Sequence, residues 1–144
     1  MWTDVIYQPG ELKVVAYDES GKAGDEKIIR TAGKPYKLDL QIDRTELAAD
    51  SKDLAYITVN VVDKEGNLCP DDGRLISFAV KGAGTYRAAA NGDPTSLDLF
   101  HLPQMHAFGG KLTAIVQSSE NGGVLSFEAN AKGLRSAKLA VNVK

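Results

Sequence analysis

The stretch that most constrains the fold of this chain runs from residue 55 to residue 70, AYITVNVVDKEGNLCP. It opens with strict alternation, and the apolar positions are Ala55, Ile57, Val59 and Val61. Successive side chains of a strand point to opposite faces, so the run predicts a half-buried strand with Tyr56, Thr58 and Asn60 outward. Residues 63–67 follow, where an aspartate caps a turn and a glycine supplies positive φ.

Similar short alternating runs, separated by turn residues, recur from Tyr36 onward. They are residues 37–42, 55–61, 76–80, 85–90, 111–117, 125–130 and 139–143. Gly82–Gly84 predicts a turn after which the chain runs back, and Asn121–Gly123 predicts a hairpin. No segment repeats apolar residues at helical spacing. The pattern therefore predicts an all-β, immunoglobulin-like sandwich of about seven strands.

Residues 1–34 are organised differently. We expect two short β segments within residues 4–17, on either side of Gln8-Pro9-Gly10, then a polar loop from Asp18 to Asp25 and a returning strand from Lys27 to Thr31. Three strands are too few to bury a sandwich core. The segment is therefore an edge addition to the sandwich of residues 35–144, or the closing strands of a preceding domain or a linker to it. We favour the second interpretation.

Charge and composition exclude several partners. The net charge is −2 and 43% of the residues are hydrophobic, which is typical of a globular domain without the basic excess of a nucleic-acid binder. No apolar run approaches the length of a membrane span. Cys69 is the single cysteine, so it forms no internal disulfide, and we interpret it as a small residue beside a turn.

The irregular stretch from residue 91 to residue 110 is the candidate contact loop. Loops of this length are usually functional or contact other parts of a protein. The candidate residues are Asn91, Asp93, Phe100, His101, His106 and Phe108. A metal site would need both histidines and an aspartate, but their spacing fixes no third ligand. The competing interpretation is that Leu99, Phe100, Leu102 and Phe108 pack onto the sandwich or a neighbour, with the histidines at the surface.

No pattern predicts catalysis or a cofactor. No serine lies in a Gly-x-Ser-x-Gly motif, and Gly82-x-Gly84 lacks the third glycine and the helix of a phosphate-binding loop. Asp71 and Asp72 lie in a turn, which predicts a solvated corner. Tyr56 is the candidate for stacking on a sugar, because the alternation places it on the outward face.

A set of ordered motifs resembles the C-terminal region of bacterial glycoside hydrolase family 2 enzymes, in particular β-galactosidases of Bacteroides-like bacteria. The motifs are Tyr7–Leu12, Arg30–Pro35, Asp43–Leu47, Asp53–Val59, Val62–Pro70, Ala90–Thr95, Phe108–Leu112 and Ala131–Leu134. They cover nearly the whole chain and keep their order.

The resemblance implies a non-catalytic accessory domain with a structural or interaction role, whose partners are the other domains of the parent enzyme. The parent would hydrolyse β-galactosides with retention in a barrel that this chain lacks, and it would be periplasmic or secreted. No catalytic residue is carried over, because the two family glutamates lie in that barrel. The alternative function is a carbohydrate-binding or invasin-like adhesion module, which would share the sandwich.

Overall fold

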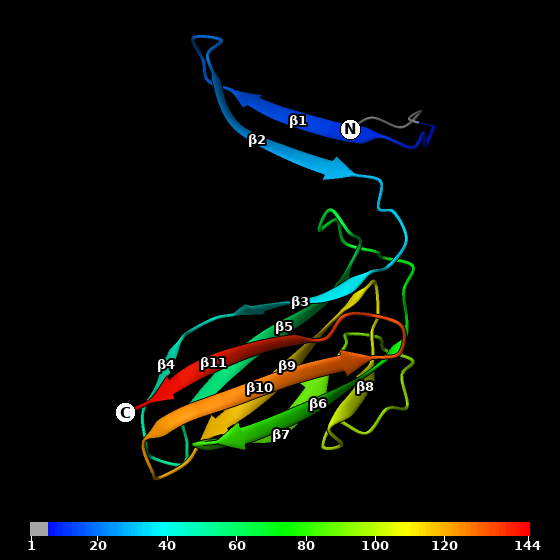
Figure 1. Cartoon of the computed structure of the whole chain (residues 1–144). Coiled ribbons are helices and arrows are strands. Elements are labelled where there is room, and N and C mark those ends of the chain that lie inside the picture. Colours follow the sequence, from blue (N-terminus) through cyan, green and yellow to red (C-terminus); the bar gives the residue numbers. More distant parts are fainter. Residues whose placement is uncertain (1–5) are drawn as a thin grey trace. The chain divides into compact units, whose positions relative to one another are not determined.

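The structure, a computed structural model, describes residues 6–144, and it contains no helix among them (Figure 1). Consequently no helix in this range could span a membrane. The chain divides into two compact units, Met1–Ala32 and Gly33–Lys144. The second unit begins two residues before the boundary expected from the sequence. The two units are described separately below.

The first unit holds a two-stranded antiparallel sheet of β1 (Glu11–Tyr17) and β2 (Ala23–Arg30). The expected loop from Asp18 to Asp25 is shorter, because the Asp18 carboxylate accepts the backbone N–H groups of Ser20 and Lys22 and closes the turn early. The strand expected before Gln8 falls partly on residues 1–5, outside the described range, and residues 6–10 form no strand.

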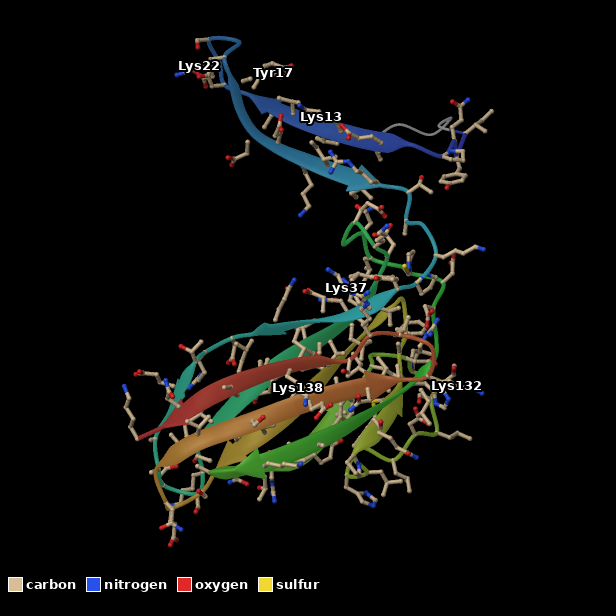
Figure 2. The ribbon with its side chains drawn as sticks, viewed as in Figure 1. Lys13, Tyr17, Lys22, Lys37, Lys132 and Lys138 are labelled. Carbon is tan, nitrogen blue, oxygen red and sulfur yellow. The ribbon has the colours of Figure 1, made fainter. Side chains whose placement is uncertain are left out.

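The two faces of this small sheet differ. On one face Leu12 lies opposite Ile29 and Val14 lies opposite Lys27, and the three apolar side chains are exposed. The other face carries two ion pairs, Glu11 with Arg30 at 2.9 Å and Lys13 with Glu26 at 2.5 Å (Lys13 is labelled in Figure 2). A lone two-stranded sheet buries too little apolar surface to be stable in water.

The second unit is a sandwich of two sheets (Figure 1). The four-stranded sheet has the order β3 (Lys37–Ile42), β5 (Leu54–Val62), β9 (Lys111–Ser118) and β7 (Gly84–Ala90). The five-stranded sheet has the order β4 (Glu46–Leu47), β11 (Ala137–Val143), β10 (Gly123–Ala131), β6 (Leu75–Gly82) and β8 (Gln104–His106). The predicted immunoglobulin-like sandwich is confirmed, and its seven longer strands coincide with the seven predicted runs.

The two additional strands are short edge strands that alternation over a few residues cannot reveal. The first, β4, pairs in parallel with β11 and places Leu47 in the core opposite Val143. The sequence placed Leu47 in a polar bend, and this assignment is wrong. Two of the five bend residues, Glu46 and Leu47, pair with β11, and only Leu47 turns into the core. The second short strand, β8, pairs with β6 and forms the other edge of the sheet.

The core lies between the two sheets. The four residues predicted to point inward from β5, namely Ala55, Ile57, Val59 and Val61, are all fully buried. The five-stranded sheet contributes Ile76, Leu125, Phe127 and Val141, which are also fully buried. The Phe78 ring stacks between Phe127 and Tyr86, with centroids 5.7 and 5.8 Å away. Tyr56 is 45% exposed on the outer face, so the predicted orientation of the strand is confirmed.

Two predicted turns carry the chain from one sheet to the other, so the turn expected at Gly82–Gly84 is present but the hairpin expected at Asn121–Gly123 is wrong. Gly82–Gly84 lies between β6 in the five-stranded sheet and β7 in the four-stranded sheet, and Asn121–Gly123 lies between β9 and β10. Neither pair of strands shares hydrogen bonds as a ladder. Turn residues determine that the chain reverses, whereas the packing of two separate sheets determines which strand becomes the neighbour.

Candidate functional site

The stretch from residue 91 to residue 110 is more ordered than its sequence indicates. It contains the short strand β8, whose central residue Met105 is fully buried. The side chains expected to pack on the sandwich or on a neighbour, Leu99, Phe100, Leu102 and Phe108, are between 37% and 61% exposed. The sandwich therefore covers these four side chains only in part, and packing on a neighbour stays a prediction. Met105 and Ala107 supply the buried contacts, because pairing with β6 turns alternate residues inward.

Tyr86 on β7 holds the backbone of this loop. Its hydroxyl donates towards the carbonyl oxygens of Phe100 at 3.0 Å and Leu102 at 2.6 Å. The Ala89 N–H also donates to the Phe100 carbonyl, at 2.9 Å. Burial against the core raises the pKa of Tyr86 to about 12, so the hydroxyl remains a donor at neutral pH. The backbone at Phe100 and Leu102 is thus fixed by its carbonyls, while the side chains of these two residues stay 61% and 37% exposed.

Short-range polar contacts hold the rest of the loop. Asp98 accepts the His106 N–H at 2.8 Å and contacts its ring Nδ1 at 3.0 Å, and these bonds lower the pKa of Asp98, with the backbone bond contributing most. Asp93 accepts the Thr95 N–H at 2.8 Å. His101 and His106 are both exposed at the surface, as expected. Each of these contacts shapes the loop, and none forms a triad of the catalytic kind.

A shallow hollow of about 450 Å³ opens beside this loop on the outer face of the four-stranded sheet. Its lining comes from β5, β7 and β9 and from the segments next to them. The lining residues are Thr58, Ala90, Asn91, Gly92, Phe108, Gly109, Lys111, Leu112 and Thr113. Two candidate contact residues, Asn91 and Phe108, therefore belong to the hollow. The other four, Asp93, Phe100, His101 and His106, do not line it.

Tyr56 lies next to the hollow along β5, two residues before Thr58 and on the same face of the sheet. Its cross-strand neighbour is Ile115 on β9. The backbone N–H of Tyr56 donates to the Asp43 carboxylate at 2.8 Å, which fixes the end of the strand. Tyr56, the residue predicted to stack on a sugar, thus lies at the edge of a hollow that the sequence did not reveal.

Several carboxylates of the second unit have structural partners. Asp63 is buried, and hydrogen bonds lower its pKa to about 2. The bond from the Gly33 N–H contributes most to this shift, followed by the bonds from Asn67. Two nitrogens of the Arg74 guanidinium bond the two carboxylate oxygens of Asp72, at 2.8 and 2.5 Å. The predicted solvated corner is therefore wrong for Asp72, whereas Asp71 is exposed. Within residues 6–144, no three metal-ligating side chains cluster.

Sequence reasoning missed several residues that matter to this face. The sequence offers Tyr86 only as a strand residue and as one of several scattered aromatic candidates for stacking on a sugar, and it does not reveal that the Tyr86 hydroxyl holds the loop. It offers Thr58, Thr113 and Lys111 as outward residues of separate strands. Alternation does place each of them on an outer face, but only the pairing of β5 with β9 brings Thr58 directly opposite Thr113. The sequence therefore indicated which face of its strand each residue occupies, but not which residues of other strands lie beside it.

Comparison with known proteins places the sandwich in a family. The sequence model described as glycoside hydrolase family 2 C-terminal domain 5 matches residues 38–140. The β-galactosidase BoGH2A of Bacteroides ovatus is 42% identical over 97% of this chain. The chain spans only 16% of the length of that relative.

Solved structures agree. A glycosyl hydrolase family 2 member from Bacteroides cellulosilyticus matches 97% of this chain with a TM-score of 0.89 and 31% identity, over 18% of its own length. A β-glycosidase from Bacteroides vulgatus matches 96% of the chain with a TM-score of 0.92 and 27% identity, also over 18% of its length. The resemblance of the ordered motifs is confirmed. The chain belongs to the C-terminal domain 5 family of glycoside hydrolase family 2.

Proposed function

We propose that this chain is a non-catalytic accessory domain of a β-galactosidase, whose barrel hydrolyses β-galactosides with retention. The observation that carries the proposal is the 42% identity to a β-galactosidase over nearly the whole chain. The chain covers only 16% of the length of that enzyme. Retaining hydrolysis needs two carboxyl groups about 5–5.5 Å apart across a substrate cleft. The bonding of Asp63, Asp72 and Asp98 to their own backbone and side-chain partners supports a structural use of these carboxylates.

The test is an activity assay with the purified chain and with the full-length parent enzyme. The parent is expected to hydrolyse a nitrophenyl β-galactoside and to produce the β-anomer first, as retention requires. The chain alone is expected to show no turnover. Turnover by the chain that persists through purification contradicts the accessory role, and an α-anomer as first product contradicts retention.

Residues 1–34 are proposed to be the closing strands of the preceding immunoglobulin-like domain, and residues 35–144 the complete accessory sandwich. The exposed apolar face of the β1–β2 sheet, formed by Leu12, Val14 and Ile29, supports this division, because such a face is normally covered by the second sheet of a sandwich. A version of the protein extended upstream by one domain is expected to protect the amides of β1 and β2 from hydrogen exchange. Unchanged exchange contradicts the division.

The loop from residue 91 to residue 110 is proposed to dock on another domain of the parent enzyme. Its backbone is fixed by Tyr86, yet Leu97 is 93% exposed and Phe100 is 61% exposed. A rigid loop that presents apolar side chains loses little conformational entropy on contact. The proposed contact residues are Asn91, Asp93, Phe100, His101, His106 and Phe108.

Paired substitutions in the chain and in the full-length parent test this docking. Phe100→Asp is expected to lower the Tm of the parent enzyme by several degrees and to leave the Tm of the isolated chain unchanged. The matched control is Val124→Asp, at an exposed apolar residue on β10 that lies far along the sequence from the loop. Equal effects of Phe100→Asp on chain and parent would contradict a contact made only in the parent.

A further inference from the structure

The floor of the hollow on the outer face of the four-stranded sheet carries two threonines within a lining that is otherwise mostly apolar. Thr58 of β5 lies directly opposite Thr113 of β9, and Thr113 lies opposite Ala90 of β7. The small alanine leaves room where β7 forms the edge of the sheet. Among the described residues, no buried side-chain oxygen or nitrogen lacks a hydrogen-bond partner. Thr58 and Thr113 are both partly exposed and line the hollow, so their hydroxyls are open to a ligand.

The wall of the hollow is a rigid turn that presents an aromatic ring. Phe108 and Lys111 exchange backbone hydrogen bonds at 2.9 and 3.2 Å across Gly109 and Gly110. Both glycines have positive φ, 59° and 74°, as a tight two-residue hairpin requires. Gly110 is also needed for space, since a Cβ there would overlap the Cys69 carbonyl oxygen. The Phe108 side chain stays half exposed above the floor.

The opposite wall is fixed as well. The Asn91 side chain donates to the His106 carbonyl at 3.0 Å and accepts the Asp93 N–H at 3.0 Å. Its amide is therefore occupied by the loop itself. Gly92 follows with no side chain to fill the opening. The other polar side chains that line the hollow are those of Thr58, Thr113 and Lys111.

We propose that this hollow is a carbohydrate-binding site that takes a neutral sugar, with one ring stacked on Phe108. A pyranose has an apolar C–H face for an aromatic ring and hydroxyl groups for Thr58, Thr113 and Lys111. No carboxylate lines the hollow to attract a cation. An apolar side chain from another domain would leave the two threonine hydroxyls without partners, so it fits the floor less well than a sugar.

The volume and the surroundings favour an oligosaccharide over a single sugar. A volume of about 450 Å³ lies within the range of ligand pockets, about 300–1,000 Å³. Tyr56 extends the same face beyond Thr58 and offers a second exposed ring. One sugar unit on Phe108 and a later unit on Tyr56 would follow β5 across the face of the sheet. The inference does not rest on the accessory role proposed above, and it assigns Asn91 and Phe108 to a sugar site in place of the domain contact proposed for them.

The test is a titration of the complete 144-residue chain, labelled with ¹⁵N, with galactose, lactose and cellobiose through the millimolar range. Amide shifts are expected at Thr58, Gly92, Gly109, Lys111 and Thr113, and they should be larger for the disaccharides. Sorbitol, an open-chain polyol without a ring face, is the control and is expected to leave these amides unchanged. Absence of shifts at these amides with all three sugars overturns the proposal, and so do equal shifts with sorbitol.

Substitutions identify the groups that bind. Phe108→Ala is expected to weaken disaccharide binding at least tenfold, whereas Phe108→Tyr, which retains a ring, should bind within about threefold of the wild type. Thr113→Val removes a hydroxyl at constant shape and is expected to weaken binding by a similar factor. Leu97→Ala is the matched control, an exposed apolar residue outside the hollow. Wild-type binding by Phe108→Ala overturns the assignment, and the unchanged spectrum of the rest of the chain verifies that each variant is folded.

Discussion

Asp63 shows how one side chain fixes the entry of the chain into the sandwich. One carboxylate oxygen accepts the Gly33 N–H at 2.7 Å and the Asn67 side chain at 3.0 Å, and the other accepts the Asn67 N–H at 2.8 Å. The sequence predicted a turn residue here, and the turn is present. What the sequence did not reveal is the bond to Gly33, thirty residues earlier.

Replacing Asp63 should alter the pH dependence of stability. The folded-state pKa is about 2, below the ordinary value of 3.8, so the unfolded chain binds the proton more readily. The resulting stabilisation is fully present above the unfolded pKa, and it is lost as pH falls through the range from about 4 to about 2. Asp63→Asn should lower the free energy of unfolding at pH 7 and reduce the further loss between pH 5 and pH 2.

Denaturant unfolding at several pH values measures this effect. Asp71→Asn is the matched control, because Asp71 is an exposed aspartate in the same region and should leave the curve unchanged. An Asp63→Asn variant with the pH dependence of the wild type would show that the carboxylate does not stabilise the folded state.

Val59 tests the assignment of faces to β5. The residue is fully buried, so Val59→Asp places an unpaired charge in the core and should lower the free energy of unfolding by about 3 kcal/mol or more. Thr58→Asp, on the outer face of the same strand, should change it by less than about 1 kcal/mol. Thermal melts of the two variants decide the matter, and a Val59→Asp protein that melts like the wild type would refute the assignment.

At the scale of elements, the connections between the sheets depend on glycine. Gly82 has a φ of 86°, and a Cβ there would overlap the Val124 carbonyl oxygen of β10. Gly84 is equally crowded, since a Cβ would meet the Leu125 side chain and the Gln117 carbonyl. The chain can pass from β6 to β7 at this point only because both residues lack side chains.

Matched glycine substitutions separate crowding from backbone strain. Gly66 also has positive φ, 94°, but nothing lies within 4 Å of its Cβ position. Gly66→Ala should therefore cost about 1 kcal/mol of strain alone, and Gly82→Ala about 3 kcal/mol or more. Chemical denaturation measures both, and equal costs would contradict the close approach of β10 to Gly82.

The loop held by Tyr86 offers a second prediction for elements. Tyr86→Phe keeps the ring that stacks on Phe78 and removes the hydroxyl that bonds the loop carbonyls. Amides of residues 99–104 should then exchange with solvent at least tenfold faster, while the amides of β5 and β9 keep their protection. Tyr56→Phe is the control, because that ring faces solvent. Unchanged exchange in residues 99–104 would show that the hydroxyl does not hold the loop.

At the scale of the whole molecule, the two units should differ in stability. The sandwich has a continuous buried core, whereas the sheet of β1 and β2 has exposed residues on both faces. Hydrogen exchange of the complete chain should therefore show slow amides in β5, β9 and β10 and fast amides in β1 and β2. Equal protection of both units would contradict this difference.

Much of the sandwich follows from the sequence alone. Alternation over five or more residues predicted all seven long strands and the inward face of β5, because a period of two has one physical meaning in a half-buried sheet. The turn at residues 63–67 is also predicted, and its glycine, Gly66, does have positive φ. The candidate residues of the contact loop were chosen by loop length and composition, and they stay a prediction.

Only the tertiary structure decided which strands are neighbours. Glycine turns reverse the chain without specifying a partner, so the sequence could not show that β6 and β7 lie in different sheets. Nor could it show the hollow, which exists because β5, β9 and β7 pair in one register and bring Thr58, Thr113 and Ala90 into a row. Side-chain periodicity is a local property of the backbone, whereas a site on a sheet is a property of pairing between distant segments.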